Sequence, residues 1–170
     1  MVKSYNVVVN SNFCTTGTAG NANSDKNYYI DWSAILPQGE YELSFSFISE
    51  TNIVTSLATL PNIYVDFLSQ ANIDAPQPGF QATASQFLGN VFPINLDPNA
   101  HNTYFRADVN FNAPIFLVNR PFNNEFRVQI VTNDNPSVSW VDQANPTPQS
   151  ISPYVMNLHF KLVKDRSNVV

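Results

Sequence analysis

Charged side chains are scarce in this chain of 170 residues. Asp, Glu, Lys and Arg make up 12% of it, about half of the ~25% that is usual for soluble domains. Asn, Ser, Thr and Gln take their place, together with 12 prolines and 13 phenylalanines. A monomer in water normally covers its surface with Lys and Glu, which keep it soluble. The neutral polar composition therefore favours a surface that meets other protein; the alternative explanation is a coding bias toward Asn.

Cations are also few and scattered. The chain holds eight Lys and Arg against 13 Asp and Glu, for a formal net charge of -5. Proteins that bind nucleic acids need clustered cations to neutralise phosphates. The nearest approach to a cluster is Lys161, Lys164 and Arg166, which suits a solvated strand end. The sequence therefore argues against sequence-specific binding of nucleic acid.

Cysteine and long apolar runs are nearly absent. Cys14 is the one cysteine, so an intrachain disulfide is excluded, which fits a reducing compartment. Residues 1–10 lack the charged segment and apolar run of a signal peptide. No stretch approaches the ~18 consecutive apolar residues of a membrane-spanning helix. We expect an unsecreted chain without a transmembrane segment.

Strict alternation of apolar and polar residues is the strongest pattern present. It is clearest in residues 28–47, where a sharp corner at 36–39 (Leu-Pro-Gln-Gly) precedes the alternating residues 41–47 (Tyr-Glu-Leu-Ser-Phe-Ser-Phe). A period of two predicts a strand with one face in a core and one near water. We expect Tyr41, Leu43, Phe45 and Phe47 to lie between two sheets.

Similar short segments recur between clusters of Gly, Pro and Asn. Predicted strands cover residues 5–9, 28–32, 41–48, 62–68, 103–109, 114–118, 125–131 and 154–163, while 84–92 suits a strand or a helical turn. No segment has a convincing helical period, so two sheets must cover each other.

These segments predict an all-β fold, a single antiparallel two-sheet sandwich with the eight strands of a jelly roll. An immunoglobulin-like sandwich is the alternative, although its Cys…Trp…Cys signal is missing. We expect a single domain over residues 1–170, with extended loops at 10–27, 69–80 and 133–152.

Residues for catalysis or metal binding do not form a recognisable pattern. His101 and His159 are far apart in the sequence and lack the clustered partners of a metal site. Hydrolase, phosphate-loop and metalloprotease motifs are missing. Glu40 and Glu42 project to one side of a strand, whereas a glycosidase needs carboxylates across a cleft. Cys14 has no His near it in sequence and suits a small apolar filler. We expect no catalytic residue, no metal ligand and no cofactor.

Aromatic residues offer two further interpretations. Tyr28, Tyr29, Trp32 and Trp140 would suit a stacking platform for sugars, or Tyr29 or Trp32 would pack in the core and Trp140 would anchor a neighbouring subunit. Trp and Tyr are favoured anchors of protein interfaces, and proline lowers the entropy that a loop loses on ordering. We favour the interface. The predicted interface residues are Trp140, Pro146, Pro148, Tyr28 and Phe122.

Several segments together resemble a known family. They are YNVVVNS at residues 5–11, IDWSAILPQGEY at 30–41, FSF at 45–47, NRPFNNEFRV at 119–128 and the closing strand 154–163. This pattern resembles the jelly-roll minor capsid proteins of large icosahedral double-stranded DNA viruses of the algal-virus and giant-virus type. The likeness extends over most of the chain.

The resemblance implies a virion structural protein, made in the host cytoplasm and located in the capsid. Such a protein bridges or cements capsomers, with the vertex among its candidate positions. Its expected partners are the major capsid protein, other minor capsid proteins and further copies of itself. The family has no catalytic residues to carry over. The alternative function is a glycan-binding β-sandwich, for example an attachment protein on the capsid surface.

Overall fold

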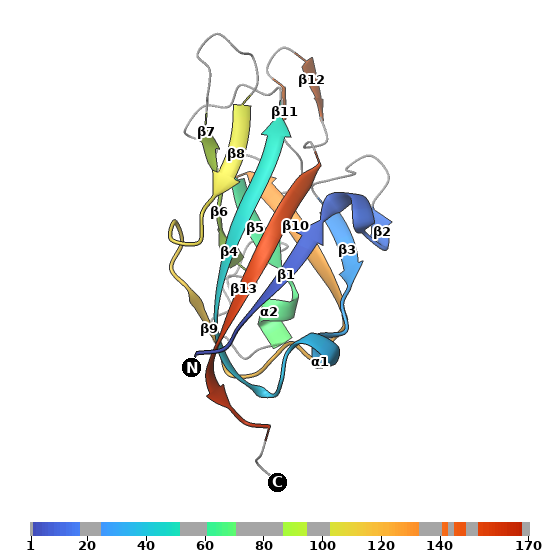
Figure 1. Ribbon diagram of the computed structural model, residues 1–170. Coiled ribbons are helices and arrows are strands. Elements are labelled where there is room, and N and C mark those ends of the chain that lie inside the picture. The colour runs from blue at the N-terminus through green and yellow to red at the C-terminus, as the bar shows by residue number, and fades with distance from the viewer. Residues whose placement is uncertain are drawn as a thin grey trace.

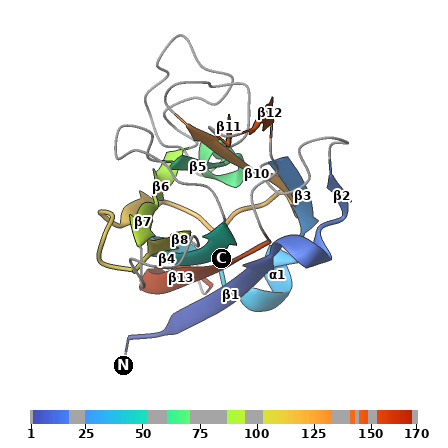
Figure 2. The same cartoon turned by 90° about the horizontal axis from the view of Figure 1, so that it is seen from above.

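Two antiparallel sheets lie face to face in the computed structural model (Figures 1 and 2). The structure describes residues 2–17, 25–51, 61–70, 87–94, 103–132, 141–142, 145–148 and 153–167. Its helices are single turns: α1 (Trp32–Ile35), α2 (Phe67–Gln70) and the 3-10 turn η1 (Ser11–Phe13). Among the described residues, no helix has the length and apolar character needed to cross a membrane.

The first sheet has the order β1-β13-β4-β8-β7, and β9 also pairs with β4. Its strands are β1 (Ser4–Asn10), β4 (Gly39–Thr51), β7 (Phe92–Ile94), β8 (Thr103–Ala107), β9 (Ile115–Leu117) and β13 (Tyr154–Asp165). The second sheet has the order β2-β3-β10-β5-β6. Its strands are β2 (Thr16–Gly17), β3 (Asp25–Tyr29), β5 (Pro61–Val65), β6 (Phe87–Asn90) and β10 (Glu125–Thr132).

The strand pairs are nested along the chain. β1 pairs with β13 in the first sheet, β3 with β10 in the second, β4 with β8 and β9 in the first, and β5 with β6 in the second. The chain is thus a long hairpin rolled up so that successive pairs alternate between the sheets, which is the connectivity of a jelly roll. The predicted two-sheet sandwich is confirmed.

The core lies between the sheets, where the sequence pattern places it. Tyr41, Leu43, Phe45 and Phe47 are all buried. On the neighbouring strand β13, Leu158 pairs with Phe45, and on the opposite sheet β10 buries its alternate residues. The core residues contributed by β10 and β13 are Phe126, Val128, Ile130, Tyr154, Met156, Leu158 and Phe160.

Two predicted strands end earlier than their apolar pattern suggests. The strand predicted over 28–32 stops at Tyr29, because the Asp31 carboxylate accepts hydrogen bonds from the backbone N–H groups of Ser33 and Ala34 and caps α1. The strand predicted over 62–68 stops at Val65, and α2 follows. Trp32 and Phe67 are buried nonetheless, so a helical turn can also direct an apolar side chain inward.

The predicted loops need partial correction. The loop predicted at 133–152 contains a small two-stranded sheet of β11 (Val141–Asp142) and β12 (Asn145–Pro148). The loop at 10–27 includes η1, β2 and the start of β3. In the segment predicted as loop at 69–80, residues 69–70 belong to α2 and residues 71–80 lie outside the described ranges. In the segment 84–92, where a strand or a helical turn was left open, Phe87–Asn90 form strand β6 and Phe92 begins β7, while residues 84–86 lie outside the described ranges.

Candidate interaction surfaces

The predicted interface residues fall into different environments. Phe122 is 73% exposed, as an interface side chain would be. Pro146 and Pro148 lie on β12, where Pro148 pairs with Val141. Trp140 lies outside the described residues, so its role stays a prediction.

Tyr28 is a core residue, which corrects its assignment to an interface. It lies opposite Phe126 in the pairing of β3 with β10, and the two rings stack at 5.5 Å. Its hydroxyl lies 2.8 Å from that of Tyr154, across the sandwich. Burial raises the pKa of Tyr28 to about 12. With 4% of its surface exposed, Tyr28 cannot anchor a partner.

Trp32 is also unable to serve as a sugar platform. It is 1% exposed, and its indole packs against the rings of Phe67, Phe126 and Phe160 at 5.2, 5.4 and 5.7 Å. Its indole N–H donates to the carbonyl of Asn123 at 3.0 Å. The possibility that Trp32 packs in the core is therefore the correct one, whereas the neighbouring Tyr29 is exposed.

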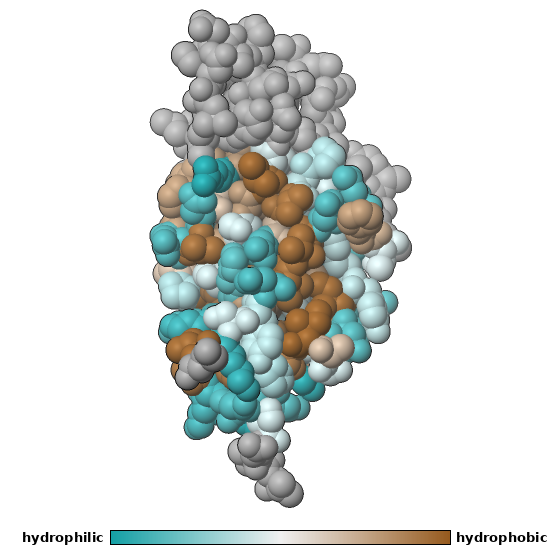
Figure 3. Space-filling model, viewed as in Figure 1, coloured by the Kyte–Doolittle hydropathy of each residue, from teal (hydrophilic) through white to brown (hydrophobic). Residues whose placement is uncertain are grey.

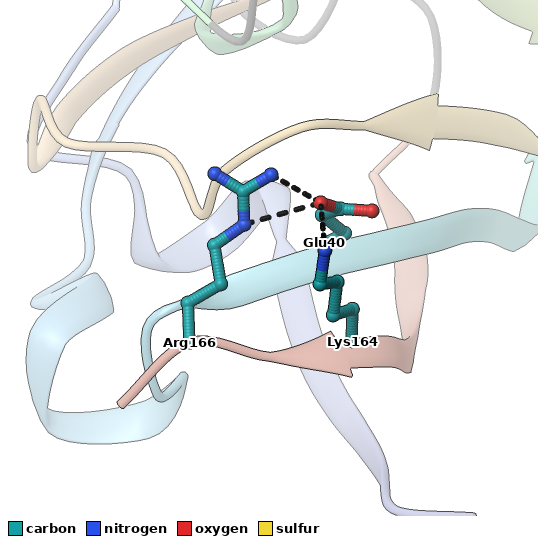
Figure 4. A network of polar contacts seen from close by, with 3 residues as sticks. All are labelled: Glu40, Lys164 and Arg166. Carbon is teal, nitrogen blue, oxygen red and sulfur yellow. Dashed lines mark hydrogen bonds and ion pairs between the residues drawn. The ribbon is translucent and has the colours of Figure 1, made fainter. Parts of the chain in front are cut away.

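The carboxylates at the start of β4 are engaged in ion pairs. Glu42 accepts from the Lys161 ammonium at 2.6 Å. Glu40 lies 3.9 Å from the Lys164 ammonium and accepts hydrogen bonds from the Arg166 guanidinium (Figure 4). Glu42 thus faces Lys161 of β13, and Glu40 faces Lys164 of β13 and Arg166, which follows that strand. No carboxylate pair spans a cleft here.

Histidine and cysteine do not converge within the described residues. His159 places Nδ1 2.6 Å from the side-chain oxygen of Asn6 on β1, and His101 lies outside the described ranges. Cys14 is half-buried against the core. In the part of the chain that the structure describes, no group of three His, Cys, Asp or Glu has the arrangement of a metal site.

An apolar patch lies on the outward face of the first sheet. Ile48 on β4 pairs with Val155 on β13, and Val8 on β1 is the diagonal neighbour of Val155. These aliphatic side chains are 52%, 39% and 63% exposed respectively. Figure 3 shows hydrophobic residues gathered on the face that carries these strands. We call Val8, Ile48 and Val155 the outer patch.

A groove and a polar centre adjoin the outer patch. The groove has a volume of about 270 Å³, and Ile48 and Val155 form part of its wall, with Asn10, Asn12 and Pro153. Asn157, which pairs with Val8, has a buried side-chain oxygen without a hydrogen-bond partner among the described residues. Apolar and neutral polar groups therefore adjoin one another here, and Arg106 on β8 is the charged neighbour of Ile48.

The sequence indicates part of the outer patch. Residues 7–9 of β1 are consecutive valines, so at least one valine must face outward. On β4, the outward-facing residues 42, 44 and 46 are polar, whereas Ile48 on the same face is apolar. What the sequence could not supply is the pairing of β1, β13 and β4, which brings these distant residues together.

A second hollow lies at the other end of the sandwich, near α1. It has a volume of about 390 Å³, and Ser33, Gln38, Asn119, Arg120, Phe122 and Asn124 contribute to its lining. The Arg120 guanidinium donates to the carbonyl of Leu36 at 2.6 Å. The hydrogen bond from Ser33 is the main cause that lowers the pKa of Asp31, and the charge of Arg120 adds to the effect. We call this hollow the Arg120 pocket.

Comparison with known proteins found no matching family model, no significantly similar curated protein and no significantly similar solved structure.

Proposed function

We propose that this chain is a non-enzymatic structural protein of a virion, a minor capsid component whose single jelly roll bridges or cements capsomers. The observation that carries the proposal is the outer patch. Val8, Ile48 and Val155 meet on a sheet face over which no described strand or helix lies.

The character of this face suits contact with another protein. Contiguous exposed apolar groups mark interaction sites, and a non-obligate interface combines an apolar centre with polar surroundings that lack dense charge. Here the aliphatic side chains adjoin the neutral residues Ser46 and Asn157. The low overall charge of the chain, 12% of residues, extends the same character to the whole molecule.

The partners that this role requires are the major capsid protein and other minor capsid proteins, with further copies of this chain as an additional contact. The protein would be synthesised in the host cytoplasm and located in the capsid. The neutral surface and the sequence resemblance support the same assignment independently of each other.

Substitution within the outer patch tests the proposal. Val155→Lys places a cation where a partner would exclude water, and burying an unpaired charge is costly. We expect incorporation of this variant into particles, measured by co-sedimentation and quantitative mass spectrometry, to fall at least about tenfold, which corresponds to ~1.4 kcal/mol.

Val163→Lys is the matched control, since Val163 lies on the same strand outside the patch and is 50% exposed. It should be incorporated like the unmodified chain, and both variants should unfold at the same temperature as that chain. The proposal fails if the unmodified protein is missing from purified particles, or if Val155→Lys is incorporated at the unmodified level.

A further inference from the structure

The Arg120 pocket combines a cation with open hydrogen-bonding capacity. A guanidinium has five N–H donors, and that of Arg120 uses one of them on the carbonyl of Leu36. Arg120 forms no ion pair with any described residue, although its charge reaches Asp31. The half-buried guanidinium therefore lines the pocket with donors that remain available to an anion.

The neighbouring side chains of the pocket are mainly neutral and polar. The amides of Gln38 and Asn119 have no hydrogen-bond partner among the described residues and lie open to solvent. The Asn124 amide is already engaged, because it accepts from the backbone N–H of Trp32 at 3.3 Å and donates to Tyr29. Gln38 and Asn119 thus offer both donors and acceptors beside the cation.

Phe122 supplies an apolar wall to this otherwise polar pocket. Its ring is exposed and lines the same hollow as Arg120. The volume of about 390 Å³ is near the lower end of the ~300–1,000 Å³ typical of small-molecule sites. A cation, two free amides and an aromatic wall around a small hollow match a compact ligand with a carboxylate, several hydroxyls and one apolar face.

We propose that the Arg120 pocket binds a carboxylated monosaccharide, either free or at the end of a glycan. The carboxylate would accept paired hydrogen bonds from Arg120, a geometry that guanidinium favours. Sugar hydroxyls would contact Gln38 and Asn119, and the C–H face of the ring would lie against Phe122. This inference does not depend on the capsid role.

An acidic peptide fits the pocket less well. Peptides are usually held through apolar anchors or by addition to a sheet edge, whereas Phe122 and Pro121 are the apolar residues of this lining. Lys164 and Arg166 lie near the same end, where Arg166 donates its backbone N–H to the carbonyl of Gln38. Both cations are already paired with Glu40, so Arg120 is the cation of this pocket that an anion would meet.

Titration of the isotope-labelled full chain with defined sugars tests this proposal. Glucuronic, galacturonic and N-acetylneuraminic acids are compared with glucose and galactose by amide chemical shifts. We expect at least one acid to give saturable shifts at residues 33, 38, 119, 120 and 122–124, with its neutral counterpart binding at least about tenfold more weakly, since charge-assisted hydrogen bonds are the stronger class.

Two pocket variants and one control locate the site. Arg120→Gln should weaken acid binding at least about tenfold. Phe122→Ala should also weaken acid binding. Because Phe122 is exposed and leaves the hydrogen bond from Arg120 to Leu36 in place, this variant still tests the site if Arg120→Gln disturbs the fold. Arg106→Gln removes the same charge at an exposed residue of β8 that pairs with Asp108 and should leave binding unchanged.

Three results would overturn the assignment. The first is no saturable shift with any acidic sugar, and the second is equal binding of acidic and neutral sugars. The third is tighter binding of triglutamate than of every sugar acid at the same residues, which would make the pocket a peptide site.

Discussion

Tyrosine hydroxyls bring polar groups into the core between the sheets. The hydroxyl groups of Tyr28 and Tyr154 form a hydrogen bond of 2.8 Å with each other, and the hydroxyl of Tyr41 donates to the carbonyl of Pro37. A buried hydroxyl without a partner would cost about 1–3 kcal/mol. These bonds therefore let large aromatic rings fill the core while their polar ends remain satisfied.

Stability should fall at alkaline pH because of these hydroxyls. Burial raises the pKa of Tyr28 from 10.0 to about 12, and burial does the same for Tyr41. The unfolded chain then releases protons first, so the stabilising contribution of each tyrosine is complete below pH ~10 and is lost as the pH rises toward 12. For Tyr28 the loss is at most about 1.4 kcal/mol per pH unit, and solvent screening makes it smaller for Tyr41.

Urea unfolding at several values between pH 9 and pH 11.5 measures this loss. Tyr28→Phe keeps the ring on Phe126 but removes one titrating group, so its stability should decline less steeply with pH. An equal slope for the variant and the unmodified chain would contradict the assignment to Tyr28.

At the same scale, the sequence distinguishes strand faces better than it distinguishes individual aromatic residues. Alternation correctly placed Tyr41 and Phe47 inside. It could not decide between Tyr28 and Tyr29, because the two tyrosines are adjacent and the residues before them, Lys26 and Asn27, are both polar. The pairing of Tyr28 with Phe126 makes that decision, and it depends on a strand about a hundred residues away in the sequence.

At the scale of elements, the long alternating strands were predictable and the single helical turns were not. The strands predicted at 41–48, 125–131 and 154–163 lie within or close to β4, β10 and β13. The turns α1 and α2 are four residues long, too short to show a helical period. Asp31 before Ser33 is a cap signal in retrospect, but it resembles an ordinary turn when no helical pattern follows it.

Gly39 links the corner at 36–39 to the last part of β13. A Cβ at this position would lie 2.5 Å from the backbone oxygen of Lys164 and 2.6 Å from a methyl carbon of Leu162. The register of β13 against β4 shifts between these two residues. A backbone oxygen in a paired strand cannot move aside without moving the strand, so only glycine fits.

Gly39→Ala should therefore lower the free energy of unfolding by about 1–3 kcal/mol, as overpacking does. Ser46→Ala, on the same strand and facing outward, should change it by no more than ~0.5 kcal/mol. Urea unfolding gives both values, and amide hydrogen exchange should show faster exchange at residues 162–166 in Gly39→Ala. Wild-type exchange there would mean that β13 does not hold Gly39 in place.

At the scale of the molecule, the nested pairing makes the two ends of the chain meet. β13 lies between β1 and β4 in the first sheet and contributes Tyr154, Met156, Leu158 and Phe160 to the core. The same arrangement assembles both candidate surfaces, since Val8 meets Val155 and Ser33 meets Arg120 only after the chain has rolled up. Sequence patterns report single strands, which is why the sandwich was predictable and these surfaces were not.

Removal of β13 should consequently unfold the whole molecule rather than trim one edge. A chain ending at residue 153 leaves β1 without its partner and one edge of β4 unpaired, and it removes four core residues. We therefore expect loss of the cooperative urea transition and of the near-ultraviolet circular dichroism. A chain ending at Ser167 keeps every described contact of β13 and should unfold like the full chain. A peptide of residues 153–167, added to the shortened chain, should restore the transition by adding the missing strand, whereas a peptide of scrambled order should not. If the shortened chain alone unfolds cooperatively with a free energy within ~1 kcal/mol of the full chain, β13 is not the strand that closes the fold.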